Sequence, residues 1–157
     1  MMKSIALAAA SALIASVSVA SSASAQIAPG NYRLETQGSQ RLGVQQSVSL
    51  NCEADLLLTV NAGGATGNIT GGDLSAGDSL CNNVNLINFN WPVTLTSTTF
   101  QVNGVGAQTL LGTCSNGQLN GNYSGGVLSI TSSSGWTSTP SFLTCAVGGQ
   151  LTLVPIP

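Results

Sequence analysis

Residues 93–104 read Val-Thr-Leu-Thr-Ser-Thr-Thr-Phe-Gln-Val-Asn-Gly, and this stretch shows most directly how the chain folds. Apolar and polar side chains alternate along it, which is typical of a β-strand with one buried face. The apolar side chains lie at odd positions before residue 97 and at even positions from Phe100 onward, and this change of phase predicts a β-bulge near residues 98–99. The closing pair, Asn103-Gly104, is typical of a tight hairpin turn.

Short apolar or alternating runs of the same kind recur along the chain, at residues 46–52, 55–60, 84–90, 127–131 and 150–154. The 55–60 run, Asp-Leu-Leu-Leu-Thr-Val, is nearly continuous and predicts a strand buried on both faces. Asn116-Gly117 and Asn120-Gly121 are further predicted turns. No stretch after residue 25 keeps helical spacing. We therefore expect an all-β fold of about eight to ten strands, a single antiparallel β-sandwich or barrel-like domain.

The composition excludes several classes of function. Charged residues make up 5% of the chain, against about 25% in an ordinary soluble domain. The sequence contains no His, which excludes Ser-His-Asp and Cys-His catalysis and zinc bound by histidine. Lys3, Arg33 and Arg41 are the three cations of the chain, too few to bind a nucleic-acid backbone by releasing counterions. Nucleic acid is therefore not an expected partner.

The first 25 residues have the pattern of a cleaved secretory signal peptide. Lys3 precedes an apolar run over residues 5–20, and Ala23-Ser24-Ala25 supplies an A-x-A cleavage site. The apolar run is shorter than the roughly 20 residues of a spanning helix, so a membrane anchor is disfavoured. We expect an exported protein, extracellular or at the cell surface with the periplasm as the alternative, and no transmembrane segment in the mature form.

We divide the chain after the signal peptide into two parts. Residues 26–45 are expected to form an N-terminal arm that is partly mobile, because Ala-Pro-Gly-Asn near its start is typical of irregular structure. Residues 46–157 are expected to form the secreted all-β domain.

Four cysteines, Cys52, Cys81, Cys114 and Cys145, follow the predicted signal peptide. An even number in an exported chain indicates two disulfides. Three pairings exist, and the spacing favours Cys52–Cys81 with Cys114–Cys145, which would close two loops of similar size. A structural zinc site is disfavoured because no two cysteines have the short spacing that such sites use. We expect no metal and no cofactor.

The carboxylates offer little chemistry. Glu53 and Asp55 lie two residues apart, on one face of a strand, where they would form an acid–base pair, a calcium corner or, as we favour, a solvated strand edge. Asp73 and Asp78 lie in a glycine-rich stretch that lacks the repeated acidic ligands of known calcium loops. Without His or a Lys after the signal peptide, no group is available to activate a Ser or Thr. We predict no catalytic residue and no enzyme activity.

The two tryptophans are the candidate ligand contacts. Trp136 follows Ser-Ser-Gly in a stretch, residues 132–140, that we interpret as a surface loop. An exposed Trp ring binds sugars or apolar ligands. Trp91, followed by Pro92, is more readily interpreted as a core side chain, with a ligand contact as the alternative.

Several short motifs point to a family. They are Cys52 before Val-Asn-Ala-Gly-Gly-Ala-Thr at 60–66, Cys81, the Trp-Pro-Val-Thr-Leu-Thr-Ser stretch at 91–97, Val-Asn-Gly-Val at 102–105, Leu-Gly-Thr-Cys at 111–114 with Asn-Gly-Gln-Leu-Asn-Gly at 116–121, and Cys145. With these motifs, residues 48–154 resemble the PraB-like activators of alkane oxidation, a family of small bacterial secreted proteins. The resemblance implies an extracellular or surface factor that helps cells use hydrophobic substrates, with no catalytic residue to carry over.

The residues themselves agree with a protein that acts at interfaces, because a nearly uncharged surface loses little solvation against oil or another protein. The expected partner is a hydrophobic substrate or interface, or another copy through self-association at sheet edges. One alternative is a structural subunit of a surface fibre or biofilm matrix, an adhesin assembled by strand addition. A weaker alternative is a carbohydrate-binding module that uses Glu53, Asp55 and the tryptophans.

Overall fold

The computed structural model describes residues 27–37 and 41–157, in which eleven β-strands and one 3-10 helix are found. The strands are β1 (Gly30–Glu35), β2 (Leu42–Gln46), β3 (Ser49–Val60), β4 (Thr66–Gly77), β5 (Asn85–Ile87), β6 (Trp91–Leu95), β7 (Thr99–Thr109), β8 (Gly112–Ser124), β9 (Val127–Ser134), β10 (Thr137–Thr139) and β11 (Cys145–Pro155), and the helix is η1 (Cys81–Asn83). The predicted signal peptide lies outside the described residues.

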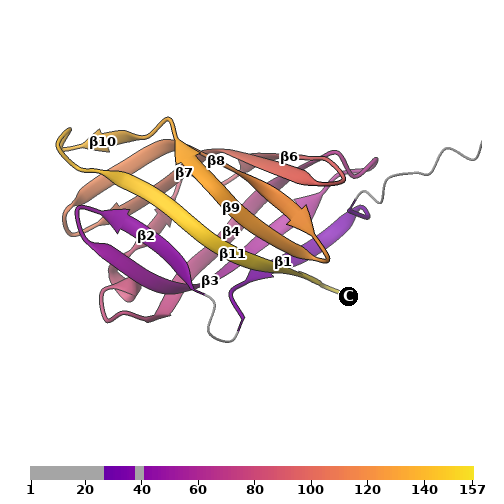
Figure 1. Cartoon of the computed structure of the whole chain (residues 1–157), viewed down its shortest axis with the longest axis horizontal. Coiled ribbons are helices and arrows are strands. Elements are labelled where there is room, and N and C mark those ends of the chain that lie inside the picture. Colours follow the sequence, from indigo (N-terminus) through magenta and orange to yellow (C-terminus); the bar gives the residue numbers. More distant parts are fainter. Residues whose placement is uncertain (1–26, 38–40) are drawn as a thin grey trace, which may run out of the picture.

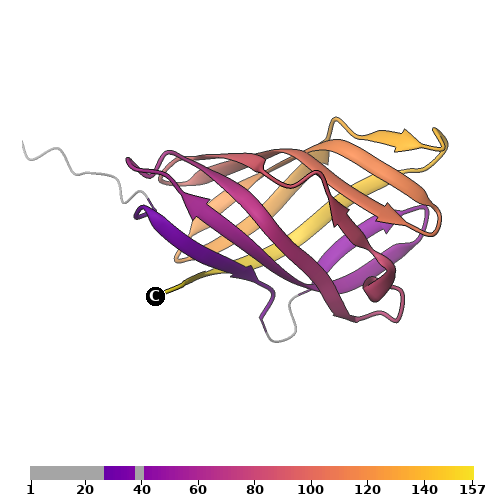
Figure 2. The ribbon, with the colours of Figure 1, turned by 180° about the vertical axis from the view of Figure 1, so that it is seen from behind.

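The strands close into an antiparallel barrel (Figures 1 and 2). Going around it, β8, β9, β11, β1, β3, β4, β6 and β7 are neighbours, and β7 pairs again with β8. Closure depends on β1, which pairs with β3 on one side and with β11 on the other, so that Leu34 lies opposite both Leu56 and Leu153. The all-β expectation is confirmed, and of its two alternatives the barrel is correct.

Three short strands complete the wall where longer ones stop. β2 pairs with β11 and β3, the same two neighbours that β1 has. β10 continues the pairing of β9 along β8, and β5 continues the pairing of β6 along β7. Eight positions around the barrel are thus filled by eleven strands.

The core fills the inside of the barrel, as expected for eight strands. β6 shows the pattern simply: Trp91, Val93 and Leu95 are buried, and the residues between them are exposed. In β3, Leu56 and Leu58 are buried, whereas Leu57 is 43% exposed. The prediction that residues 55–60 are buried on both faces is therefore wrong, because only the inner face of this wall is covered.

The opening stretch, residues 93–102, is a hairpin of β6 and β7 and not one bulged strand. The turn at residues 96–98 causes the change of phase. It contains no Gly, Asn or Pro and is stabilised instead by the Thr96 hydroxyl, which accepts hydrogen bonds from the backbone N–H of Thr98 (3.2 Å) and of Thr99 (2.9 Å). A Thr-rich turn of this kind carries no strong sequence signal.

The three Asn-Gly pairs, by contrast, are not hairpin turns. All of them lie inside the long strands β7 and β8, where the pairing register shifts between Val102 and Val105 and again near Asn120. Gly104 and Asn116 have φ values of 74° and 58°, the left-handed backbone that a β-bulge requires. These pairs therefore produce bulges that let long strands curve around a narrow barrel.

The boundary expected at residue 46 does not separate an arm from the barrel. Within the expected arm, β1 is hydrogen-bonded on both sides, and Ile27, Tyr32 and Leu34 are buried in the core. Tyr32 also donates its hydroxyl to the carbonyl of Ala28 at 2.7 Å. The first strand is needed because residues 152–155 of β11 would otherwise have no partner on that side.

The two ends of the barrel differ in their connections. At one end, drawn at the left of Figure 1, lie the turns at 47–48 and 110–111, the segment 78–84 with η1, and the segment 140–144. Both disulfides tie this end together, Cys52–Cys81 and Cys114–Cys145, as the spacing predicted. We name it the disulfide end. The other end, with the turns at 61–65, 96–98 and 125–126, is named the turn end.

Candidate functional site

Large apolar side chains are exposed mainly at the disulfide end. Those among the described residues that lie there are Val48, Leu80, Leu110, Leu111 and Phe142. Leu110 is 84% exposed and Phe142 78%, which is unusual for side chains of this size. The two others found exposed are Leu57, on the outer wall, and Ile156, at the turn end. Exposed apolar side chains that gather in one place mark a binding surface more often than scattered ones do.

Four of these side chains surround a cavity of about 150 Å³. Its lining residues are Val44, Gln46, Val48, Leu50, Leu80, Asn83, Val84, Thr109, Leu110 and Leu111. None of them is charged, and the polar ones are one Gln, one Asn and one Thr. We name this cavity with its exposed rim the apolar mouth.

The Cys52–Cys81 disulfide positions one segment of the rim. Cys81 begins η1 directly after Leu80, and its bond to Cys52 holds this segment against the start of β3. The carboxylate of Asp78 supports the same segment by accepting a hydrogen bond from the backbone N–H of Asn51 at 2.7 Å. Cys145 begins β11 directly after the segment that carries Phe142, and its bond to Cys114 ties that segment to β8.

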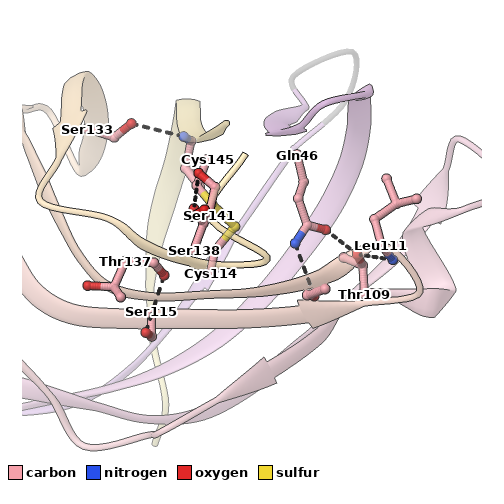
Figure 3. The surroundings of a disulfide bond; sticks show 12 residues. Gln46, Thr109, Leu111, Cys114, Ser115, Ser133, Thr137, Ser138, Ser141 and Cys145 are labelled. Carbon is pink, nitrogen blue, oxygen red and sulfur yellow. Dashed lines mark hydrogen bonds between the residues drawn. A yellow bond between two sulfur atoms is a disulfide. The ribbon is translucent and has the colours of Figure 1, made fainter. Parts of the chain in front are cut away.

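Gln46 holds the remaining turn of the rim (Figure 3). Its side chain is 5% exposed, and its amide donates to the carbonyl of Gly112 at 3.0 Å while its carbonyl accepts from the Thr109 hydroxyl. The Thr109 hydroxyl in turn accepts from the backbone N–H of Leu111 at 3.1 Å. These bonds fix the turn bearing Leu110 and Leu111 against β2. A single Gln in an alternating strand gives no sequence signal for this role, because its partners are more than sixty residues away.

Two smaller cavities lie behind the mouth. One, of about 20 Å³, is lined by Gln46 and Thr109 on one side and by Trp136 on the other. The second, of about 40 Å³, lies in the barrel core among apolar side chains and both tryptophans. Val44 lines all three cavities. Val44, Gln46 and Thr109 thus form the wall that the mouth shares with the cavity of about 20 Å³.

The structure places the two tryptophans differently. Trp91 is 3% exposed, donates its indole N–H to the carbonyl of Ile87 at 3.1 Å and stacks on Phe89 with ring centroids 4.9 Å apart. It is a core residue that borders the inner cavity. Trp136 lies between β9 and β10, half-buried rather than on a surface loop, and its ring lies over Gly117.

Gly117 makes room for that ring. A Cβ at this position would lie 2.4 Å from two atoms of the Trp136 indole, closer than any real contact. The Asn-Gly pair at 116–117 therefore serves both the bulge and the packing of Trp136.

Glu35, Glu53 and Asp55 form ion pairs on the outer wall. Glu53 lies 2.9 Å from Arg41, and Asp55 accepts from both Nε and Nη2 of Arg33, whose Nε is also 3.2 Å from Glu35. The hydrogen bond to Asp55 and its negative charge raise the pKa of Arg33. Since Glu53 and Asp55 each have a separate cation, they give no support to an acid–base pair.

The described residues contain no group of three or more side chains suited to bind a metal ion. Within the same ranges, no helix has the length and apolar character needed to cross a membrane.

Fold and site together define a small closed antiparallel barrel, cross-linked by two disulfides, with an apolar mouth at one end. The family model for alkane oxidation protein activators of the PraA/PraB-like type matches residues 1–156, and the chain therefore belongs to this family. Searches of curated proteins and of solved structures gave no match.

Proposed function

We propose that this protein is an exported, non-enzymatic factor that helps cells use hydrophobic substrates, and that it binds alkane chains at the apolar mouth. The observation that carries the proposal is the gathering of exposed Leu and Val side chains around an uncharged cavity, in a member of an alkane oxidation activator family.

The energetics favour contact with hydrocarbon at this end. Burying a Leu side chain contributes about 1.5–3 kcal/mol, so two or three side chains of the rim supply useful affinity. Among the described residues, the charged groups stand on β1, β3 and β4 or next to the ends of β2 and β4, and none lines the mouth. Docking on a hydrocarbon surface therefore desolvates few groups that would resist it.

Binding without catalysis agrees with the chemistry of the mouth. The chain has no His, and the hydroxyl that lines the cavity, on Thr109, is already engaged with Gln46. Export agrees with the two disulfides, which persist in oxidising compartments.

The test measures how the purified protein partitions onto hexadecane droplets. We expect the double variant Leu110→Ser/Leu111→Ser to bind at least about tenfold more weakly, because two rim side chains no longer enter the oil. The matched control is Leu57→Ser, which removes a Leu of similar exposure to Leu111 from the outer wall, and which should bind as the unaltered protein does.

Equal loss in both variants, or no partition of the unaltered protein, would overturn the proposal. A second arm places the same variants in a strain that grows on long-chain alkanes. Normal growth of a complete deletion strain on these alkanes would also overturn it.

Fibre assembly by strand addition has less support. The barrel is closed, and the ends of its hydrogen-bonded sheet are β5 and β10, each of three residues. Size-exclusion chromatography in the same experiments reports self-association directly.

A further inference from the structure

Behind the apolar mouth lies a buried polar atom that the fold does not satisfy. The indole N–H of Trp136 is shielded from solvent and has no hydrogen-bond partner among the described residues. The contrast with Trp91 is direct, because the indole N–H of Trp91 donates to the carbonyl of Ile87. A buried donor without an acceptor costs folding free energy, and native proteins rarely keep one without a reason.

Within the core cavity, water is a poor partner for this donor. A buried water usually makes about three hydrogen bonds. The core cavity beside Trp136 is lined by aliphatic side chains and the two tryptophans, and of the two indoles only that of Trp136 is uncommitted. The group that fits is an oxygen that accepts one hydrogen bond and belongs to an otherwise apolar molecule.

Polar side chains lie between the mouth and the Trp136 indole. Gln46 and Thr109 line the mouth and also the cavity of about 20 Å³ behind it, and Trp136 lines that same cavity. The volumes suit the two parts of such a molecule: the mouth offers about 150 Å³ with an apolar rim, and the space beside Trp136 admits a few atoms. A ligand entering with its oxygen first would have to separate the hydrogen-bonded Gln46–Thr109 pair before it reaches the indole.

We propose that the mouth takes a straight alkyl chain carrying one oxygen acceptor near its end, as in a ketone, an aldehyde or an alcohol. The oxygen accepts the hydrogen bond of the Trp136 indole, and the chain fills the mouth between Leu80, Leu110 and Leu111. This inference rests on the proposed function, since it names the class of hydrocarbon bound at the same site. It makes the protein a receptor that distinguishes oxygenated hydrocarbon from the parent alkane.

The test compares two probes of similar size, hexane and methyl butyl ketone, by nuclear magnetic resonance of the ¹⁵N-labelled protein. Methyl butyl ketone should move the Trp136 indole proton downfield, as a new hydrogen bond does, and hexane should leave it in place. The Trp91 indole is the internal control, because its proton already has an acceptor and should not move with either probe.

The variant Trp136→Phe keeps a ring and removes the donor. We expect it to weaken binding of the ketone by about tenfold, the value of one hydrogen bond, while binding of hexane changes far less. Should this variant fail to fold, the shift of the indole proton in the unaltered protein still decides the question.

Two results would overturn the inference. The first is that both probes shift backbone resonances of the mouth while the Trp136 indole proton stays in place. The second is that Trp136→Phe weakens the binding of both probes equally. Either result would mean that the mouth binds hydrocarbon without recognising the oxygen. The proposed function then survives. If neither probe shifts any resonance of the mouth, the inference and the proposed function fail together.

Discussion

The two ends of the barrel join the same antiparallel strands in opposite ways. At the turn end, two of the loops contain local hydrogen bonds. The Asn61 carbonyl accepts from the N–H of Gly64, and Asn61 donates its backbone N–H to the Thr66 carbonyl and its side-chain amide to the Thr66 hydroxyl. In the other loop, the Thr96 hydroxyl contacts that of Thr99 three residues on. At the disulfide end, the interactions join residues far apart, with sequence separations of 29 and 31 for the disulfides and 63 for Gln46 and Thr109.

The difference explains why exposed apolar side chains gather at the disulfide end. A local turn needs polar residues that satisfy their own backbone, as residues 61–65 and 96–98 do. A loop held by a disulfide is fixed by a covalent bond, so its other side chains are free to serve another purpose. Leu80, next to Cys81, and Phe142, three residues before Cys145, are side chains of this kind.

The largest expected effect comes from the disulfides. Replacing either pair, as Cys52→Ser/Cys81→Ser or as Cys114→Ser/Cys145→Ser, should lower the free energy of unfolding by about 3–4 kcal/mol, because loops of this length regain their disorder when unfolded. Denaturant unfolding under non-reducing conditions measures the loss. The control is the unaltered protein with reductant, which should be no more stable than either variant; a loss below about 1 kcal/mol would show that the disulfide end does not need its cross-links.

Gly117→Ala should have the next largest effect. The new methyl group collides with the Trp136 indole and should cost about 1–3 kcal/mol in unfolding free energy. Gly148→Ala is the matched control in another strand, since a Cβ there meets no atom within 4 Å, and it should change stability by less than about 0.5 kcal/mol. Equal stability of the two variants would show that the Trp136 ring does not rest on β8.

Two threonines test the comparison of the ends most directly. Thr109→Val leaves the buried Gln46 carbonyl and the Leu111 N–H unpaired and should cost about 1–2 kcal/mol. Thr96→Val removes bonds in an exposed turn, where water replaces the hydroxyl, and should cost about 0.5–1 kcal/mol. Both changes keep a β-branched side chain. Thermal unfolding ranks them, and a larger loss at Thr96 would contradict the long-range role of the Gln46 pair.

The smallest effect on stability is expected at the rim itself. Leu110 is exposed, so Leu110→Ser should change the free energy of unfolding by no more than about 0.5 kcal/mol in either direction. Hydrogen exchange of the β7 and β8 amides provides a second measurement. A marked destabilisation would mean that the Leu110 side chain packs in the folded protein and is not held available for a ligand.

Part of the architecture could be predicted because it depends on neighbours in the chain. The period of two in residues 93–95 and 100–102 predicts strands, and cysteines about thirty residues apart predict the two disulfides. The turn at 96–98 was missed because its stability comes from the Thr96 hydroxyl, and Thr is as common in strands as in such turns. The Asn-Gly pairs misled for the converse reason, since left-handed backbone serves bulges and turns equally well.

The candidate site shows the same limit more strongly. Trp136 was a predicted ligand contact, but the sequence does not show that its N–H is buried without an acceptor. Gln46, Leu80 and Leu110 were not predicted as site residues at all. They come from three segments that meet only when the barrel closes, and each is unremarkable in its own stretch of sequence.

The sequence alone determined that this chain forms strands, pairs its cysteines in two disulfides and lacks the charged groups for most catalysis, because periodicity, spacing and composition are local or additive properties. Tertiary structure alone decided that the strands close into a barrel, that β1 belongs to it, and that three distant segments form one apolar mouth. The physical reason is that closure satisfies the edges of the first and last strands with each other, and this pairing joins residues more than a hundred positions apart.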